Sequence, residues 1–240
     1  MLHLTGLSAQ QAVATGRLQV YTTQYPPFCY TENDQVTGVA TDMVVALMAK
    51  MGVSPHIQSL PWARALESIS GPANVMLYTV TRTEERERQF KWVGPLMSSH
   101  VVLFAHRDAN LVIKRLEDAK AVKAIGTVQG YATQSLLRDK GFTNLDALAG
   151  SEGGNPEKLM TGRIDLWATD NVTGIYQAKL RGVDPAMMKV VYRVVELPKY
   201  LAFSKQTDDQ IIKQWQAALD KAKKDGTFHK ILAHWGIDDE

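Results

Sequence analysis

Arg86 is the residue of this chain whose type and place most suggest binding chemistry. It follows the apolar stretch of residues 74–81 by a few positions. A guanidinium there could hold a carboxylate, because its planar fork of donors matches the two carboxylate oxygens. Its neighbours in the chain are mostly charged, so Arg86 could equally be a solvated arginine on a helix surface. Spacing alone leaves both interpretations open.

Two further positions could meet a charged ligand. Asp170 directly follows the apolar residues 164–169; its carboxylate could accept an ammonium group, or it could cap the next helix, because Asp is a favoured N-cap. Gly130 separates a predicted strand from a predicted helix. The N–H groups of Tyr131 and Ala132 would then lie at a helix start, where they could bind an anion. An ordinary turn glycine would look the same.

Aromatic residues near strand ends and helix starts are candidates for the walls of a pocket. Tyr25 and Trp62 flank prolines in loop-like segments, so we expect them to be more exposed than Phe28 and Trp167, which we expect in the core. Covalent catalysis is not indicated, since there is no Gly-x-Ser-x-Gly motif. Cys29 has no neighbour that would lower its pKa and is expected to be a packed thiol.

The composition excludes several classes of protein. The chain has 240 residues, of which 45% are hydrophobic and 22% charged, with a net charge of +2. These values are typical of a globular protein, and the net charge is small for a nucleic-acid binder. No apolar run approaches the roughly 18 residues of a membrane span. One cysteine and six scattered histidines predict neither a disulfide nor a metal site, and no glycine-rich nucleotide loop indicates a cofactor.

Strands and helices alternate along the chain and would position these residues. Strands are predicted at residues 17–22, 56–60, 74–81, 101–105, 124–128, 164–169 and 190–195. Helices are predicted at residues 41–51, 62–69, 132–140 and 172–181, and from an N-cap at Asn155 to Gly162. A further pair is predicted between residues 208 and 235, joined near Asp225-Gly226. This alternation predicts an α/β fold with mostly parallel sheets, which bind ligands at the carboxyl ends of their strands.

The order and spacing of these segments resemble those of the family 3 extracellular solute-binding proteins. These are the binding proteins of amino-acid ABC transporters, and they have the type II periplasmic binding fold. The matching stretches are TQYPPFCY, VTGVATDMVVALMAKMG, NVMLYTVTRTEER, FKWVGPL, GTVQGYATQSLL, LMTGRIDLWATDN and KKDGTFHKILAHWG. They run from about residue 17 to residue 235. The segment PWARAL, which contains Trp62, is similar to one subgroup of this family.

The resemblance implies a clamp for the ligand's α-carboxylate. Arg86 ends a Thr-x-x-Arg motif headed by Thr83 and would be the clamping arginine. The helix start at Tyr131 and Ala132 would hold the same carboxylate, although the family often has Ser or Thr there. Arg82 ends a second Thr-x-x-Arg motif and is a rival for the clamp.

The resemblance also implies contacts to the rest of the ligand. Thr79 and Thr81 would meet it through backbone and hydroxyl groups, and Asp170 would accept its α-ammonium. Tyr25 would lie over its side chain. Thr22 stands where an Asp is common in the family, which weakens the case for a basic side chain on the ligand.

A two-lobed architecture follows from the same resemblance. Residues 16–105 and 199–240 would form one lobe and residues 106–198 an inserted second lobe, with crossovers near residues 104–106 and 198–202. The lobes of a monomer would close on a small ligand, an amino acid or a related carboxylate, and deliver it to the membrane component of an ABC transporter. The expected location is the periplasm. Residues 1–17 do not read as a signal peptide, so we expect that the signal peptide has been removed.

Two other functions stay open at this point. The same fold serves as the ligand-sensing domain of receptors, and cyclohexadienyl dehydratases resemble this family too. An enzyme of that kind would need an acid over its substrate, and Glu152 and Glu196 are the candidates by position.

Overall fold

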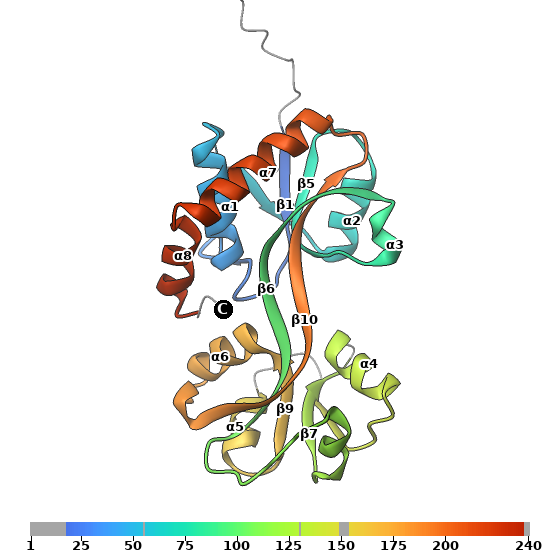
Figure 1. The fold of residues 1–240 in the computed structure, drawn as a ribbon, viewed down its shortest axis with the longest axis vertical. Coiled ribbons are helices and arrows are strands. Elements are labelled where there is room, and N and C mark those ends of the chain that lie inside the picture. The colour runs from blue at the N-terminus through green and yellow to red at the C-terminus, as the bar shows by residue number, and fades with distance from the viewer. Residues whose placement is uncertain (1–17, 55, 130, 149–153, 238–240) are drawn as a thin grey trace, which may run out of the picture.

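The structure is a computed structural model that describes residues 18–237 apart from 55, 130 and 149–153. It has two bodies joined by two long strands, β6 (Phe90–His106) and β10 (Met188–Ser204) (Figure 1). Helices cover the sheet in both bodies, so the predicted α/β fold is confirmed. None of the helices in the described residues is both long and apolar enough to span a membrane.

One mixed sheet of eight strands runs through both bodies in the order β4-β1-β5-β10-β6-β9-β7-β8. Its shorter strands are β1 (Gln19–Thr22), β4 (Ile57–Ser59), β5 (Val75–Thr81), β7 (Ile125–Val128), β8 (Leu145–Leu148) and β9 (Leu166–Asp170). β1 pairs in parallel with β4 and β5, and β7 pairs in parallel with β8 and β9. Every pairing of β6 and β10 is antiparallel. A separate hairpin joins β2 (Tyr30–Glu32) to β3 (Gln35–Thr37).

The helices divide between the two bodies (Figure 1). The first body carries α1 (Val39–Lys50), α2 (Trp62–Ser70), α3 (Glu84–Glu87), α7 (Asp209–Lys224) and α8 (Thr227–Trp235). The second body carries α4 (Ala132–Asp139), α5 (Asn155–Met160) and α6 (Asn171–Leu180). In the described residues, 3₁₀ turns span Leu116–Ala121 and Pro185–Met187. Gly226, with φ 77°, separates α7 from α8 where the sequence predicted the joint.

The hydrophobic cores show where β6 passes from one body to the other. Met97 packs in the core cluster of the first body, whereas Leu103 and Phe104 pack in clusters of the second. Val101 already pairs with Asp170 of β9. The first crossover therefore lies before Val101, and the crossover expected near residues 104–106 and the lobe boundary after residue 105 fall inside the second body.

β6 and β10 are much longer than the strands predicted at residues 101–105 and 190–195. The sequence Gly94-Pro95 argued against a strand in the first half of β6, because proline cannot donate a ladder hydrogen bond and rarely enters a central strand. At this proline the register of β10 against β6 shifts, between Lys199 and Leu201 of β10. The proline is thus accommodated by a bulge, which interrupts the ladder locally.

The start of α5 also differs from the prediction. Gly154, not Asn155, is its N-cap residue, and Asn155 is the first residue of the helix. The Asn155 side chain is buried and its amide donates to the Thr127 carbonyl at 3.3 Å. A buried side chain that ties α5 to β7 looks the same in the sequence as a cap, because both uses favour a short amide.

Candidate functional site

Arg86 lies in α3, a single helical turn that begins at its N-cap Thr83. The Thr83 hydroxyl accepts from the backbone N–H of Arg86 at 3.4 Å. The guanidinium of Arg86 donates to the Thr81 carbonyl at 3.2 Å and its Cζ lies 5.0 Å from the ring centre of Trp62. Within the described part of the chain Arg86 forms no ion pair. Most of its five N–H donors are therefore available to a carboxylate.

Arg82, the rival clamp, is already paired. Its Nε and Nη2 donate to the two carboxylate oxygens of Glu87 at 2.5 and 2.6 Å. The hydrogen bonds raise the pKa of Arg82 and lower that of Glu87. The guanidinium also lies 5.7 Å from the ring centre of Trp92 and 5.6 Å from that of Tyr200. Because a bidentate pair uses the fork that a ligand carboxylate would need, the geometry favours Arg86.

Thr79 and Thr81 end the buried strand β5 beside Arg86. Thr79 has φ 63°, a left-handed conformation that is strained for a β-branched residue and is typical of functional sites. Its hydroxyl donates to the Tyr78 carbonyl at 2.6 Å and lies 3.2 Å from Cys29 Sγ. The hydroxyl therefore points into the protein, so a contact from Thr79 to a ligand would come from its backbone. Cys29 is fully buried and burial raises its pKa, which confirms the packed thiol.

The helix start expected to bind an anion is present at α4, whose first residue is Ala132. Tyr131 is its N-cap residue and makes no capping hydrogen bond with its side chain. The backbone N–H of Tyr131 donates to the Val128 carbonyl at 3.2 Å, so this donor is used within the turn. The tyrosine ring is 45% exposed. Gly130, which the sequence singled out here, lies outside the described residues. α4 lies on the same side of β6 and β10 as α2 and α3 (Figure 1).

Asp170 caps α6, as one of the two sequence interpretations predicted. Its Oδ1 accepts from the N–H groups of Val172 and Thr173 at 3.0 and 3.3 Å. Its Oδ2 accepts a short hydrogen bond from the Ser99 hydroxyl and lies 3.5 Å from Lys199 Nζ. A carboxylate has about four acceptor sites, and here four donors meet it. The structure thus gives this carboxylate to Lys199, whereas the resemblance gave it to a ligand ammonium.

Lys199 is the charged residue that sequence reasoning missed. It lies in β10, is 2% exposed, and pairs in register with Thr81 on one side and Met97 on the other. Its Nζ donates to Ser99 Oγ at 2.6 Å. The same Nζ lies 4.3 Å from the ring centre of Phe28 and 5.5 Å from that of Tyr25.

The surroundings of Lys199 have two opposed effects on its charge. Burial lowers the pKa of Lys199, and the nearby Asp170 counteracts that shift. The aromatic wall expected from Tyr25 therefore exists, but it lies against a lysine of the protein. A lysine between apolar residues, in LPKYLAF, was the signal that could have indicated this arrangement.

Trp62 and the core aromatics occupy the environments that the sequence predicted. Trp62 is 40% exposed, whereas Phe28 and Trp167 are fully buried. Trp62 is the first residue of α2, after Pro61, and its ring contacts Arg86. Together Arg86, Trp62 and the end of β5 form one cluster on the first body, which we call the Arg86 cluster.

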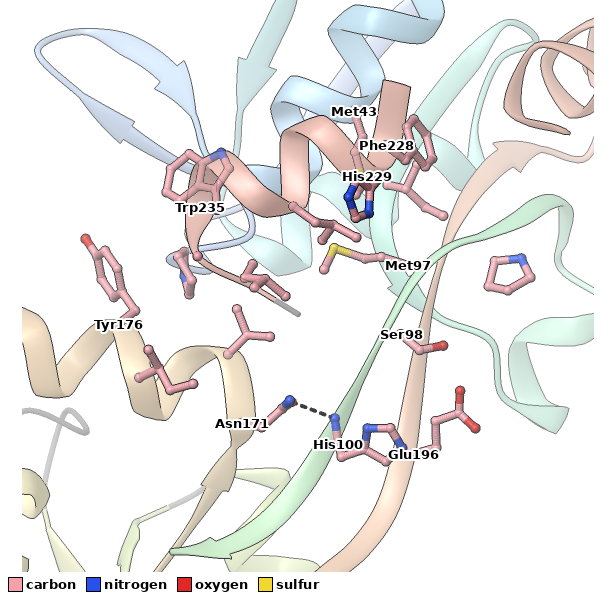
Figure 2. Close-up of a pocket in the computed structure, with 18 of the residues that line it drawn as sticks. Met43, Met97, Ser98, His100, Asn171, Tyr176, Glu196, Phe228, His229 and Trp235 are labelled. Carbon is pink, nitrogen blue, oxygen red and sulfur yellow. Dashed lines mark hydrogen bonds between the residues drawn. The ribbon is translucent and has the colours of Figure 1, made fainter. Parts of the chain in front are cut away.

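A cavity of about 630 Å³ lies between α6 and α8, on the other side of β6 and β10 from α3 and α4. Its walls include Met97, Tyr176 and Trp235, and Glu196 of β10 (Figure 2). None of the nine binding residues predicted from the sequence is among the described residues that line it. Ser98 and His100 line it but Ser99 does not; the Ser99 hydroxyl instead contacts Asp170 and Lys199. Lys199 and Asp170 are likewise not among the described residues that line this cavity.

Comparison with known proteins identifies the family. The model of the bacterial extracellular solute-binding proteins, family 3, matches residues 18–238. The chain belongs to this family. The solute-binding function predicted from the sequence is therefore confirmed. Members of the family are extracellular or periplasmic, bind small molecules and work with ABC transporters.

Individual relatives are distant in sequence and similar over nearly the whole chain. The "Probable amino-acid-binding protein YxeM" of Bacillus subtilis is 23% identical over 224 residues, which cover 88% of this chain and 80% of the relative. The L-cystine-binding protein TcyJ of Escherichia coli K12 is 24% identical over 216 residues, or 88% and 79% of the two chains. The structure of an ancestral cationic amino acid solute-binding protein, AncCDT-1, superposes with a TM-score of 0.76 at 23% identity and covers 92% of this chain and 95% of its own. This likeness confirms the type II periplasmic binding fold.

Proposed function

We propose that this protein captures a small carboxylate, an amino acid or a related acid, between its two bodies and delivers it to an ABC transporter. One observation carries the proposal. Arg86 presents a guanidinium that is oriented by Thr81 and Trp62 and is unpaired by any acid in the described residues. Its relatives, which are named as amino-acid-binding and cystine-binding proteins, support a ligand of this class. We propose that it acts as a monomer in the periplasm.

The rest of the site would complete the capture from both bodies. The fork of Arg86 would hold the carboxylate on the first body, beside the strained backbone of Thr79. The start of α4 would meet the same carboxylate on the second body through Ala132, because the N–H of Tyr131 is used within the turn and a helix start favours an anion through its dipole. A ligand that contacts both bodies binds the closed form more tightly than the open form, and it therefore closes the protein.

We propose that binding occurs without turnover. Glu196, one candidate acid, lines the cavity between α6 and α8 (Figure 2), away from the Arg86 cluster. Glu152, the other, lies outside the described residues. Incubation with prephenate or arogenate is therefore expected to leave both substrates intact, as followed by chromatography. Turnover that disappears in Glu196→Gln or Glu152→Gln would favour the dehydratase-like alternative.

A thermal-shift screen against the twenty amino acids and a set of small carboxylates tests the binding function. A ligand at about 100 times its Kd adds about 2.7 kcal/mol to the free energy of unfolding. For a chain of this length this corresponds to a rise in Tm of roughly 5–10 °C. Each hit is then measured by calorimetry, which gives the affinity directly.

Variants of the arginines decide which residue binds. Arg86→Ala is expected to weaken binding at least 100-fold, because it removes the charge and the hydrogen bonds to the carboxylate. Arg88→Ala removes the same charge from an exposed neighbour at the end of α3 and serves as the matched control. Arg82→Ala is expected to retain binding, because Glu87 already occupies that guanidinium. Unchanged affinity in Arg86→Ala, or a loss confined to Arg82→Ala, would contradict the proposal.

A further inference from the structure

We propose that the ligand is an acid without a free α-ammonium group, because Lys199 takes the place of that ammonium beside Asp170. The inference rests on the proposed function, the capture of a carboxylate by Arg86, and it narrows the class of ligand. It follows from the contacts of one buried carboxylate and one buried ammonium, which lie in the sheet next to the Arg86 cluster.

The protein itself fills the acceptor sites of Asp170. Two backbone N–H groups of α6 bind Oδ1, and Ser99 and Lys199 approach Oδ2. Since a carboxylate offers about four acceptor sites, a ligand ammonium could bind here only after one donor had left. The helix donors are fixed by the backbone, and Ser99 is 1% exposed. The donor that would have to leave is therefore Lys199.

Lys199 is held firmly in its place. It lies in the middle of the sheet, since β10 pairs with both β5 and β6 at this residue. Its side chain is 2% exposed and packs against the rings of Phe28 and Tyr25, where a cation is stabilised by the ring faces. A second ammonium at Asp170 would meet the lysine charge in a region of low dielectric, where like charges repel strongly.

The Lys199–Asp170 pair is linked to Arg86 through Thr81. Lys199 stands opposite Thr81 in the ladder, and the Thr81 carbonyl accepts from Arg86. The Lys199–Asp170 pair has no net charge, and Glu87 is occupied by Arg82. Arg86 and the start of α4 therefore leave the site positive. Such a site favours an anion and disfavours a zwitterion, whose ammonium would lose its water without gaining an opposite charge.

Matched pairs of acids test the inference on the unaltered protein. Each pair consists of an amino acid and the same acid with hydrogen in place of the amino group: L-aspartate and succinate, L-glutamate and glutarate, L-phenylalanine and 3-phenylpropanoate, L-norleucine and hexanoate. Affinities are measured by calorimetry at neutral pH. In the pair that binds best, the acid without the amino group is expected to bind at least tenfold more tightly.

The possible outcomes separate this inference from the proposed function. Equal or tighter binding of the amino acid, still lost in Arg86→Ala, overturns the inference and leaves carboxylate capture standing. Binding of neither member of any pair overturns the capture of such acids, and the inference falls with it.

Lys199→Gln tests the role of the lysine itself. The glutamine can still reach Ser99 but carries no charge, so Asp170 becomes available to a ligand ammonium. We expect the preference between the two members of the best pair to shift at least tenfold toward the amino acid. Lys50→Gln, which removes a surface partner of Asp225, is the control for the loss of one positive charge. An unshifted preference in a Lys199→Gln protein that folds, as judged by circular dichroism, would refute the role of Lys199, and the matched pairs decide the ligand class even if that variant does not fold.

Discussion

The buried pair of Lys199 and Asp170 predicts a loss of stability whose size depends on pH. In Asp170→Asn the new amide still caps α6, because Asn is a favoured N-cap, but Lys199 loses its opposite charge. A buried ammonium without a partner releases its proton rather than remain charged. The free-energy cost of releasing that proton is therefore the upper limit of the stability lost in this variant. From the ordinary lysine pKa of 10.5, the limit is about 5 kcal/mol at pH 7 and about 2 kcal/mol at pH 9.

The sign of the pH dependence follows from the protons bound by each state. In Asp170→Asn the pKa of Lys199 is lowered in the folded state and is about 10.5 in the unfolded state. At a pH between these two values, the unfolded chain binds a proton that the folded chain does not. The free energy of unfolding therefore rises with pH in this range. In the unaltered protein the rise is smaller, because Asp170 counteracts the lowering of the lysine pKa. The difference between the two proteins is expected to shrink by up to about 1.4 kcal/mol per pH unit.

Urea unfolding at pH 7, 8 and 9, followed by circular dichroism, measures this difference. The double variant Asp170→Asn with Lys199→Met is expected to lose the extra pH dependence, because the titrating group is gone. Lys199→Met alone should cost less at pH 7 than Asp170→Asn, since Asp170 keeps three hydrogen-bond donors. An equal loss at pH 7 and pH 9 in Asp170→Asn would refute the reasoning, as would an unchanged slope in the double variant.

Three other outcomes are expected. Gly38→Ala should cost about 2–4 kcal/mol in urea unfolding, because its Cβ would lie 2.5 Å from the Phe28 carbonyl oxygen. Gly52→Ala has a positive φ but open space and should cost only about 1–2 kcal/mol. Cys29, whose pKa is raised by burial, should react with a thiol reagent only after unfolding, and fast reaction of the native protein would contradict the packed thiol. The pKa of Asp225 is lowered from 3.8 to about 2 by its hydrogen bond from Lys50, so it stabilises the fold above its ordinary pKa and stops doing so as the pH falls toward 2. Asp225→Asn should therefore lose less stability than the unaltered protein between about pH 5 and about pH 2, as urea unfolding measures.

Features that depend on a few neighbouring residues were predictable from the sequence. The cap at Asp170 is one, because the apolar strand, the Asp and the helix follow each other directly in the chain. The joint at Gly226 is another, since a residue with positive φ favours glycine. The position of Arg86 after β5 and the exposure of Trp62 beside a proline are of the same kind. In each case the deciding interaction spans only a few residues.

Features that depend on distant partners were not predictable. Lys199 contacts Ser99, which is 100 residues away in the sequence, and Asp170, which is 29 residues away. No local sequence pattern predicts partners at such separations. The sequence did not predict the ion pair that distinguishes Arg82 from Arg86. Glu87 lies five residues after Arg82, which is not a spacing that predicts an ion pair on a helix. The ligand class proposed above rests on these two pairings, and the family resemblance contains neither of them.

The place of β10 in the sheet has a consequence for how the molecule is made. β10 lies between β5 and β6, yet a ribosome synthesises it after β7, β8 and β9. A nascent chain therefore carries β5 and β6 with unpaired edges while β7, β8 and β9 emerge, and such edges favour association with other chains. The pairings that close them are between residues far apart in the sequence, which makes folding slow. Release of the C-terminal part of the chain, rather than folding of the N-terminal part, is thus the step that ends the exposure of the sheet.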